Sequence, residues 1–416
     1  MQLRTTVDSK TNNHWRVVVV ALFAGVIAAG HVGKLPPALP SIRTQLGLDL
    51  VTAGWLASMF SAIGAVAALC LGAIADRLNP RRLAVGGLVL MMVSGFAGSF
   101  ATTPLQLIVS RFCEGVGFLT VVVAAPSMIG RATSGRARRV ALGLWPAYMP
   151  AGVSLMILAA PMVLNTGGWR ALWIAVAVVA TLGTVAVWVF GENPGDEHGV
   201  TYCPSEWQNI RIAVSQAGPW LISACFALYG MQLYAVITWM PTFMIDERGL
   251  NSSSAAGLTA VIVGGNGLGN LFGSWLLHRG AASGTMILVS GAMMTLLAFG
   301  MFAIDLPDTA RYLCSFFLCG VGGVVASAAF AAAPSIAASP RQLGIVNGML
   351  VQASNIAQFA GPVGVATCVA ILGGWESAMW PFIAVNVLLI CVAAFAILHG
   401  RRLTTQHRLA TESQNR

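Results

Sequence analysis

The sequence predicts an all-α membrane protein in which twelve transmembrane helices form two six-helix bundles related by a pseudo-two-fold repeat. The first observation is composition: 57% of the 416 residues are hydrophobic and only 9% are charged, against about 25% charged in a soluble domain. So few charges exclude a soluble fold and favour helices in lipid, where backbone groups must pair with one another. The other two observations are the lengths of the apolar runs and an internal repeat.

Apolar runs of about twenty residues, bounded by charged or turn-forming clusters, predict twelve spans. The first six cover 16–39, 51–75, 83–101, 104–129, 140–163 and 168–190. The last six cover 217–244, 254–277, 284–304, 309–334, 343–371 and 378–399. We therefore expect an N-terminal bundle over 1–190, a cytoplasmic linker over 191–216, a C-terminal bundle over 217–400 and a cytoplasmic tail over 401–416.

The basic residues predict the orientation of these spans. Seventeen lysines and arginines fall on the side of the N-terminus, whereas only Arg43, Arg170, Arg248 and Arg311 fall on the other side. Because basic residues are retained in cytoplasmic connections, both termini are expected in the cytoplasm. No cleavable signal peptide is expected, because the first residues of the given sequence are polar. We expect a monomeric multi-pass protein of the bacterial inner membrane.

The internal repeat supports two similar halves. A shift of 205 residues aligns Gly115-Val-Gly117 with Gly320-Val-Gly322. Further glycine matches keep the same order along the chain. Parallel repeats of this kind are typical of secondary transporters that move around a site near the midplane.

The connection between spans 2 and 3 reads GAIADRLNPRRL, where an acid and several arginines meet at helix ends. Charges so placed can form a salt-bridged conformational latch, and a small residue lets two helices approach. The alternative is that they only set topology. The segment resembles the GxxxDRxGRR-type loop of the major facilitator superfamily, with a degraded copy, GSWLLHRG, in the second half. The residues that match this latch are Gly72, Asp76, Arg77, Arg81 and Arg82; Asn79 and Pro80 depart from the pattern.

Span 4 reads RFCEGVG, which is similar to the RxxxGxG pattern of that superfamily at Arg111, Gly115 and Gly117. The pattern occurs in proton-coupled drug exporters and in anion-type branches. Span 5 reads GLWPAYMPAG and lacks the GPxxGG motif of the exporters. The chain is thus loosely similar to the cyanate and nitroimidazole permease branch. The resemblance implies alternating access, with helices 1, 4, 7 and 10 lining a central cavity.

Four strongly ionisable residues fall within the predicted spans: His31, Lys34, Arg111 and Glu114. The C-terminal half is expected to hold none. Such residues usually face a cavity, because charge within a membrane costs about 2.5–3.5 kcal/mol per residue on insertion scales. From a rise of about 1.5 Å per residue, Lys34 and Arg111 share one layer, and His31 and Glu114 share a second.

Two cations and one acid predict a site for a small anionic solute, held by Lys34 and Arg111 with His31 nearby. Glu114 or His31 would couple transport to protons. Alternatively, Arg111 and Glu114, spaced i,i+3, neutralise each other while Lys34 extends toward the outer interface.

The C-terminal half must close the cavity with neutral groups. Tyr229, Gln232 and Tyr234 on span 7 are candidates for substrate contacts, since they offer hydrogen bonds and stacking. Tyr234 fits an interfacial aromatic belt equally well. Asn266 and Asn270 are expected to join helices rather than bind substrate.

Other function classes fit less well. A proton-coupled exporter of drugs or cations would use Glu114 as its recognition acid, and a non-transport receptor would carry a larger soluble element. An enzyme is not expected, because no catalytic or phosphate-binding motif is present. No metal or cofactor is expected, as the eight cysteines show no CxxC spacing. The basic residues lie in short connections, so the partners are the lipid bilayer, the solute and protons rather than nucleic acid.

Overall fold

The computed structural model describes residues 2–75, 78–191, 211–212, 214–302, 306–336 and 340–414, and within these ranges it contains helices and no strands. The helices of the first half are α1 (Gln2–Gly33), α2 (Leu35–Leu46), α3 (Leu50–Ser58), η1 (Met59–Ser61), α4 (Ala62–Ala75), α5 (Pro80–Ser99), α6 (Pro104–Ala132), α7 (Gly135–Leu144), η2 (Trp145–Ala147) and α8 (Tyr148–Phe190). The helices of the second half are α10 (Ala217–Asp246), α11 (Ser252–His278), α12 (Ser283–Phe302), α13 (Asp308–Ile336), α14 (Pro340–Leu372), η3 (Trp375–Ala378) and α15 (Met379–Gln414).

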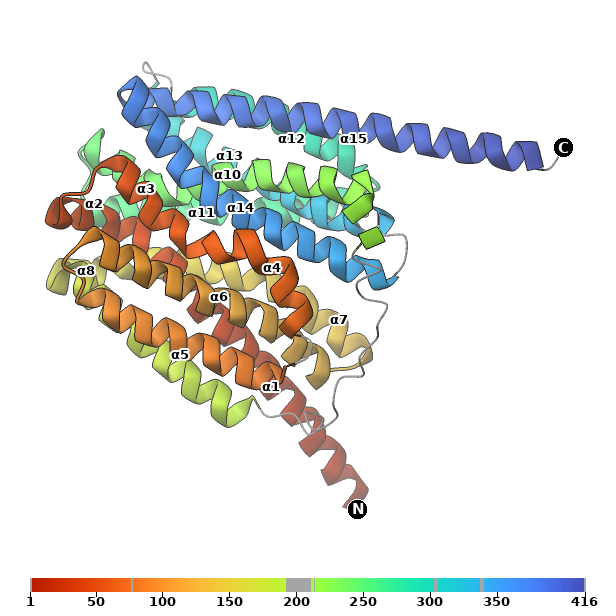
Figure 1. Cartoon of the computed structure of the whole chain (residues 1–416), viewed down its shortest axis with the longest axis horizontal. Coiled ribbons are helices and arrows are strands. Elements are labelled where there is room, and N and C mark those ends of the chain that lie inside the picture. The colour runs from red at the N-terminus through yellow and green to blue at the C-terminus, as the bar shows by residue number, and fades with distance from the viewer. Residues whose placement is uncertain are drawn as a thin grey trace. The chain divides into compact units, whose positions relative to one another are not determined.

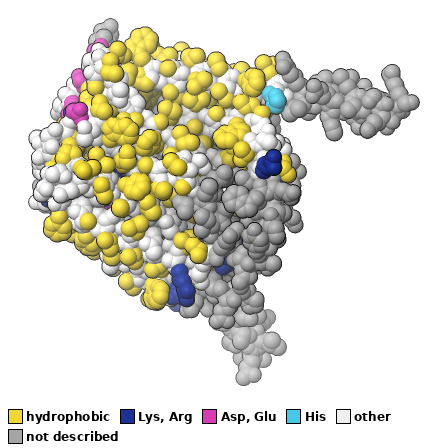
Figure 2. All heavy atoms as spheres, in the orientation of Figure 1, with side chains coloured by type: hydrophobic (Ala, Val, Ile, Leu, Met, Phe, Trp, Pro, Cys, Tyr) yellow, Lys and Arg dark blue, Asp and Glu magenta, His cyan; other side chains and the backbone are white. Residues whose placement is uncertain are grey.

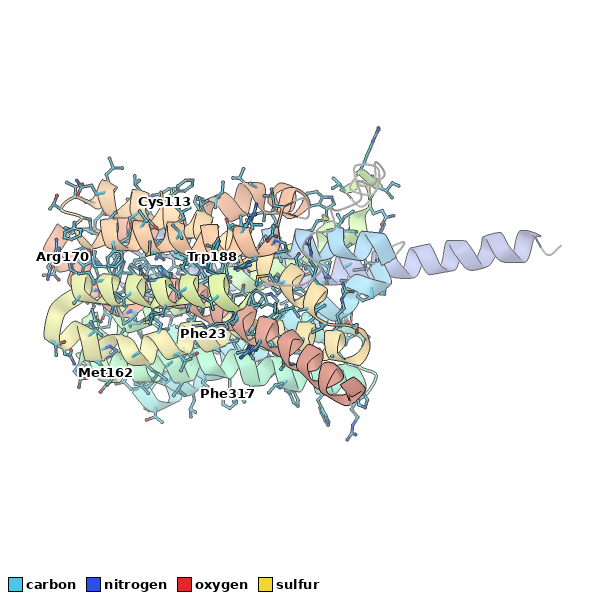
Figure 3. All side chains as sticks on the ribbon, turned by 90° about the horizontal axis from the view of Figure 1, so that it is seen from below. Phe23, Cys113, Met162, Arg170, Trp188 and Phe317 are labelled. Carbon is cyan, nitrogen blue, oxygen red and sulfur yellow. The ribbon has the colours of Figure 1, made fainter. Side chains whose placement is uncertain are left out.

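Eleven stretches of the described chain are long and apolar enough to cross a membrane, and one of them is long enough to cross it twice. That stretch is α8, whose 43 residues would extend about 65 Å as one helix, twice the thickness of the hydrocarbon layer. The helix breaks at Gly168, where φ is 69°, a conformation that glycine adopts without the penalty a Cβ would bring. Figure 3 shows the two arms, with Met162 before the turn and Trp188 after it. Counting both arms gives the twelve passes that the sequence predicts.

The chain divides into two compact units, residues 1–202 with 235–261, and residues 203–234 with 262–416. In the first unit α5 packs along α6, α1 packs along α8, and both α1 and α4 contact α6 (Figure 1). In the second unit α12 packs along α13 and α15. The bundle boundaries drawn from the sequence remain predictions, and most of the expected linker lies outside the described residues.

Local capping explains where the helices nearest the site begin. A capping box starts α6: the Gln106 amide donates to the Thr103 hydroxyl, and Gln106 Oε1 accepts from the Thr103 amide. Asn79 caps α5 by accepting from the Arg82 amide at 3.1 Å, and Pro80 takes the first helical position. Asn79 and Pro80, the two residues that depart from the family loop pattern, therefore form the start of a helix.

The surface fits a bilayer. Large apolar side chains such as Val66, Leu105 and Leu296 are at least 69% exposed. On the face that Figure 2 shows, apolar side chains predominate and described charged ones are few. Because such a surface is unfavourable in water and favourable in lipid, the chain is a multi-pass membrane protein.

Candidate functional site

Two helices of the first unit, together with the junction that follows one of them, carry the four predicted ionisable residues. His31 lies in the last turn of α1, and Lys34 follows at the junction to α2, where its amide still donates to the Gly30 carbonyl at 2.9 Å. Arg111 and Glu114 lie on α6, spaced i,i+3 and therefore on one face. Because α1 packs along α6, the two pairs meet.

Glu114 is the centre of the resulting charge cluster, which we define as His31, Lys34, Arg111 and Glu114. Lys34 Nζ donates to Glu114 Oε1 at 2.5 Å, and Arg111 Nη1 donates to Glu114 Oε2 at 2.5 Å. Arg111 Nη1 also donates to the His31 carbonyl at 2.8 Å. The imidazole Nδ1 of His31 lies 3.4 Å from Glu114 Oε1. One carboxylate therefore holds both cations.

The charge cluster is completely enclosed. His31, Lys34 and Glu114 are 0% exposed and Arg111 is 1% exposed. Removing charges from water is expensive unless they are paired and hydrogen-bonded, and here the pairing leaves one excess positive charge. That excess favours an additional anion at the cluster.

Aromatic rings cover both cations. Lys34 Nζ lies 4.4 Å from the centre of the Trp173 ring, and the Arg111 guanidinium carbon lies 4.5 Å from the centre of the Phe60 ring. Phe60 can lie so close because α6 has Gly115 there, where an added Cβ would overlap the Phe60 carbonyl. In desolvated surroundings such cation–π contacts stabilise by about 2 kcal/mol or more. Sequence reasoning missed both rings, since nothing distinguishes them from the other aromatic residues of the spans.

Three nitrogen atoms, two in the charge cluster and one in the Trp173 ring that covers Lys34, have no hydrogen-bond partner among the described residues. They are Arg111 Nε, Trp173 Nε1 and His31 Nε2. The first two can only donate, and the third donates in one tautomer. Because buried polar atoms are normally paired, these donors are suited to an oxyanion such as a carboxylate or sulfonate.

The structure joins the two layers that the helical rise predicts. Lys34 and Arg111 both reach Glu114, so all four residues form one cluster. The alternative hypothesis, in which Arg111 and Glu114 neutralise each other while Lys34 extends toward the outer interface, is correct in part, because the Arg111–Glu114 ion pair is present. Its other half is wrong, because Lys34 is buried against Glu114 instead of extending toward the interface. Whether the cluster binds substrate stays a prediction.

The three candidates on α10 take part in hydrogen bonds between helices of the second unit. Tyr229 accepts from Asn266 Nδ2 at 2.8 Å, and Asn266 also donates to the Cys319 carbonyl at 3.0 Å. The role of Asn266 in joining helices is thereby confirmed. Gln232 Nε2 donates to Asn386 at 2.7 Å, and the hydroxyls of Tyr234 and Ser354 lie 3.2 Å apart.

Tyr234 is 9% exposed, which disfavours the lipid-facing aromatic belt. A role of Tyr229, Gln232 and Tyr234 in substrate binding stays a prediction.

One expectation about buried charge is wrong. The sequence places Arg311 in a connection and predicts no buried charge in the C-terminal half, yet Arg311 is only 1% exposed. Arg311 is buried because α13 already begins at Asp308 and packs along α12. Arg311 Nη1 therefore donates to the Met301 carbonyl, 2.8 Å away near the end of α12. A cation at a helix C-terminus is favourable there.

The predicted latch falls partly outside the described residues, which include neither Asp76 nor Arg77. Arg81 donates to the Trp188 carbonyl and lies 4.9 Å from the Trp188 ring, so it ties the start of α5 to the end of α8. The Arg82 amide takes part in the α5 cap. The latch assigned to Gly72 and these residues stays a prediction.

Comparison with known proteins identifies the family to which this architecture belongs. A sequence profile described as the Major Facilitator Superfamily matches residues 21–362. A bacterial homologue of the human lysosomal transporter Spinster, in an inward-facing and unoccupied conformation, superposes with a TM-score of 0.75 at 17% identity, over 94% of this chain and 97% of that one. At this identity the likeness concerns the fold.

Three curated relatives are transport proteins. A probable sulfoacetate transporter of Cupriavidus necator is 26% identical over 62% of this chain and 63% of its own length. A cis,cis-muconate transport protein of Acinetobacter baylyi is 23% identical over 62% of this chain and 64% of its own length. The chain thus spans less than two thirds of these two relatives. A cephamycin export protein of Amycolatopsis lactamdurans is 24% identical over 90% of this chain and 88% of its own length.

Proposed function

Because the chain belongs to the major facilitator superfamily, whose profile matches most of its length, we propose that it is a secondary transporter for a small organic anion. The observation that carries the proposal is the excess of cations and free N–H donors around one buried carboxylate. The names of the sulfoacetate and muconate relatives point to substrates of the same class. A carboxylate or sulfonate would satisfy Lys34, Arg111 and the Trp173 indole together.

We propose that substrate and Glu114 compete for the same two cations. In the substrate-free cluster both Glu114 oxygens accept bonds from Lys34 and Arg111. An entering oxyanion takes over these donors, and the released carboxylate can then accept a proton. His31, with Nδ1 3.4 Å from Glu114, is placed to relay it. The arrangement supports proton-coupled anion transport, because each anion bound would bring one proton with it.

The rival function, an exporter of cationic or neutral drugs, requires Glu114 to be free as a recognition acid. Both of its oxygens are occupied by cations of the protein itself, so a drug cation would have to displace Lys34 or Arg111. A cation entering a site with excess positive charge meets repulsion. The geometry therefore favours the anion.

Ligand-dependent thermal unfolding of the purified protein tests the proposal, since stabilisation follows affinity without presuming a direction of transport. The panel contains small mono- and dicarboxylates, sulfonates, inorganic anions and lipophilic cations. We expect stabilisation by at least one organic anion, and weakening of its binding by about 2–5 kcal/mol in Lys34→Gln and Arg111→Gln. Arg111→Lys should also bind poorly if the contact is a two-pronged guanidinium fork.

The matched control is Arg311→Gln, an equally buried arginine that bonds the Met301 carbonyl instead of the charge cluster. It should keep the parent's anion affinity. Normal affinity in both Lys34→Gln and Arg111→Gln, or stabilisation by lipophilic cations alone, would reject the anion site.

Proteoliposomes test the coupling. Glu114→Gln keeps the shape and hydrogen bonds of the side chain but cannot titrate, so we expect anion exchange to continue while uptake driven by an inward proton gradient is abolished. If the variant still concentrates the anion as well as the parent does, Glu114 is only a partner of Arg111. The same assay on His31→Gln then shows whether His31 carries the proton.

A further inference from the structure

The second unit contains a cavity of about 960 Å³, and none of the residues of the charge cluster lines it. Its lining comes from the start of α10, the start of α12, the end of α13 and the last apolar turns of α15. Spans alternate in direction, so these two starts and two ends lie at the same membrane surface. It is the surface that the basic residues predict to be cytoplasmic.

The cavity is polar at its mouth and apolar inside. Gln216, Ser283, Ser335 and His399 all lie at helix or span ends, and thus toward the membrane surface. The deeper lining is aliphatic or small, as Ile222, Cys225, Ile287 and Ala393 show. The volume lies near the upper end of the range of about 300–1,000 Å³ that small-molecule sites occupy. An apolar space of this size, open at a membrane surface, suits a hydrocarbon chain better than water, which would find few partners inside.

Charge at the mouth selects the kind of lipid. Among the described residues that line the cavity, none is acidic. His399 lies at the mouth, and Arg401 and Arg402 follow it in the sequence after one glycine. Basic residues at the end of a span attract anionic lipid headgroups.

We infer that this cavity binds one acyl chain of an anionic membrane lipid whose headgroup lies at the mouth, beside His399. The inference requires only that the chain is embedded in a membrane and is independent of the transported solute. A bound lipid would fill the space between α10, α12, α13 and α15.

Native mass spectrometry of the delipidated full chain in detergent tests the inference. The probes are phosphatidylglycerol, phosphatidylcholine with the same acyl chains, and glycerol phosphate as the headgroup alone. We expect one phosphatidylglycerol to bind about tenfold more tightly than phosphatidylcholine, a difference of about 1.4 kcal/mol, and glycerol phosphate not to bind. Equal binding of the two lipids, or binding of glycerol phosphate as tight as that of the lipid, would overturn the inference.

Substitutions locate the lipid. Ala332→Trp and Ala396→Trp fill the cavity from α13 and α15 and should each lower phosphatidylglycerol occupancy about tenfold. Leu398→Trp, at a side chain 56% exposed on the same helix, is the matched control and should bind as the parent does. If both filling variants retain full occupancy, the lipid is not in the cavity.

A further variant leaves the apolar lining unchanged, so it tests the inference even if the two tryptophan variants misfold. In Arg401→Gln/Arg402→Gln the preference for phosphatidylglycerol over phosphatidylcholine should fall at least threefold. An unchanged preference would remove the role assigned to the mouth.

Discussion

Replacement of Glu114 by glutamine perturbs the charge balance of the cluster most directly. The carboxylate accepts from Lys34 Nζ and Arg111 Nη1, both at 2.5 Å, and among the described residues it is the one acid in ion-pair contact with either. Glutamine preserves length and shape but leaves two buried cations without a counter-charge. Removing one partner of a buried ion pair typically costs about 3–5 kcal/mol. We expect the free energy of unfolding to fall by about that amount.

The same variant should bind the substrate anion more tightly, because the internal competitor for Lys34 and Arg111 is gone. If an anion regains only about 1.4 kcal/mol of what the substitution removed, its affinity rises tenfold. Calorimetric titration of the anion found in the thermal screen, together with unfolding in a denaturing-detergent titration, measures both effects. Glu247→Gln, the same substitution at an exposed glutamate, is the control and should alter neither. A variant as stable as the parent, or one that binds the anion more weakly, would refute the competition between substrate and Glu114.

Three further predictions concern topology and local structure. Reporter fusions near positions 200 and 410 should report the cytoplasm and one near 249 the opposite side; a cytoplasmic signal at 249 would break the twelve-pass topology. Gly168→Ala should lower stability by about 1–2 kcal/mol, because φ is 69° there, whereas Gly257→Ala, in open space, should not; equal melting temperatures of the two variants would contradict this. Asp49→Ala should cost about 1 kcal/mol, because Asp49 Oδ1 accepts from the Thr52 amide at 2.8 Å and caps α3. The Thr52 side chain and backbone hold the pKa of Asp49 below its ordinary value, so its ionised form contributes stability above that ordinary value and the contribution is lost as pH falls through the lowered pKa. The difference in melting temperature between Asp49→Ala and the parent should therefore shrink from pH 7 to pH 3, and a difference that grows would be inconsistent with the cap.

Much of the fold is predictable because lipid imposes simple rules. The apolar runs place the end of span 5 and the start of span 6 on either side of 164–167, and the structure turns at Gly168, one residue further on. Four ionisable residues among apolar ones are equally conspicuous, so the cluster is predictable down to its members. The layering is not, because the helical rise places backbone atoms only, and the long side chains of Lys34 and Arg111 span the distance to Glu114.

The remaining parts of the site depend on tertiary contacts that leave no local signal. Trp173 follows the break in α8 and Phe60 lies on a short 3-10 turn, and both become partners of cations only after distant helices pack. Arg311 shows the opposite error: a charged residue at a span boundary looks exposed until the end of the preceding helix is known to accept from it.

The two-to-one ratio of cations to acid in the charge cluster has an electrical consequence. With the His31 ring neutral, the empty site carries one net positive charge. A site that holds a monovalent anion and a protonated Glu114 carries the same charge. A full elementary charge crossing a potential of 100 mV changes energy by about 2.3 kcal/mol, so the membrane voltage acts equally on the step that moves the solute and, in the opposite sense, on the return of the empty protein. Over a whole cycle the two contributions cancel, and the proton gradient rather than the voltage drives the solute.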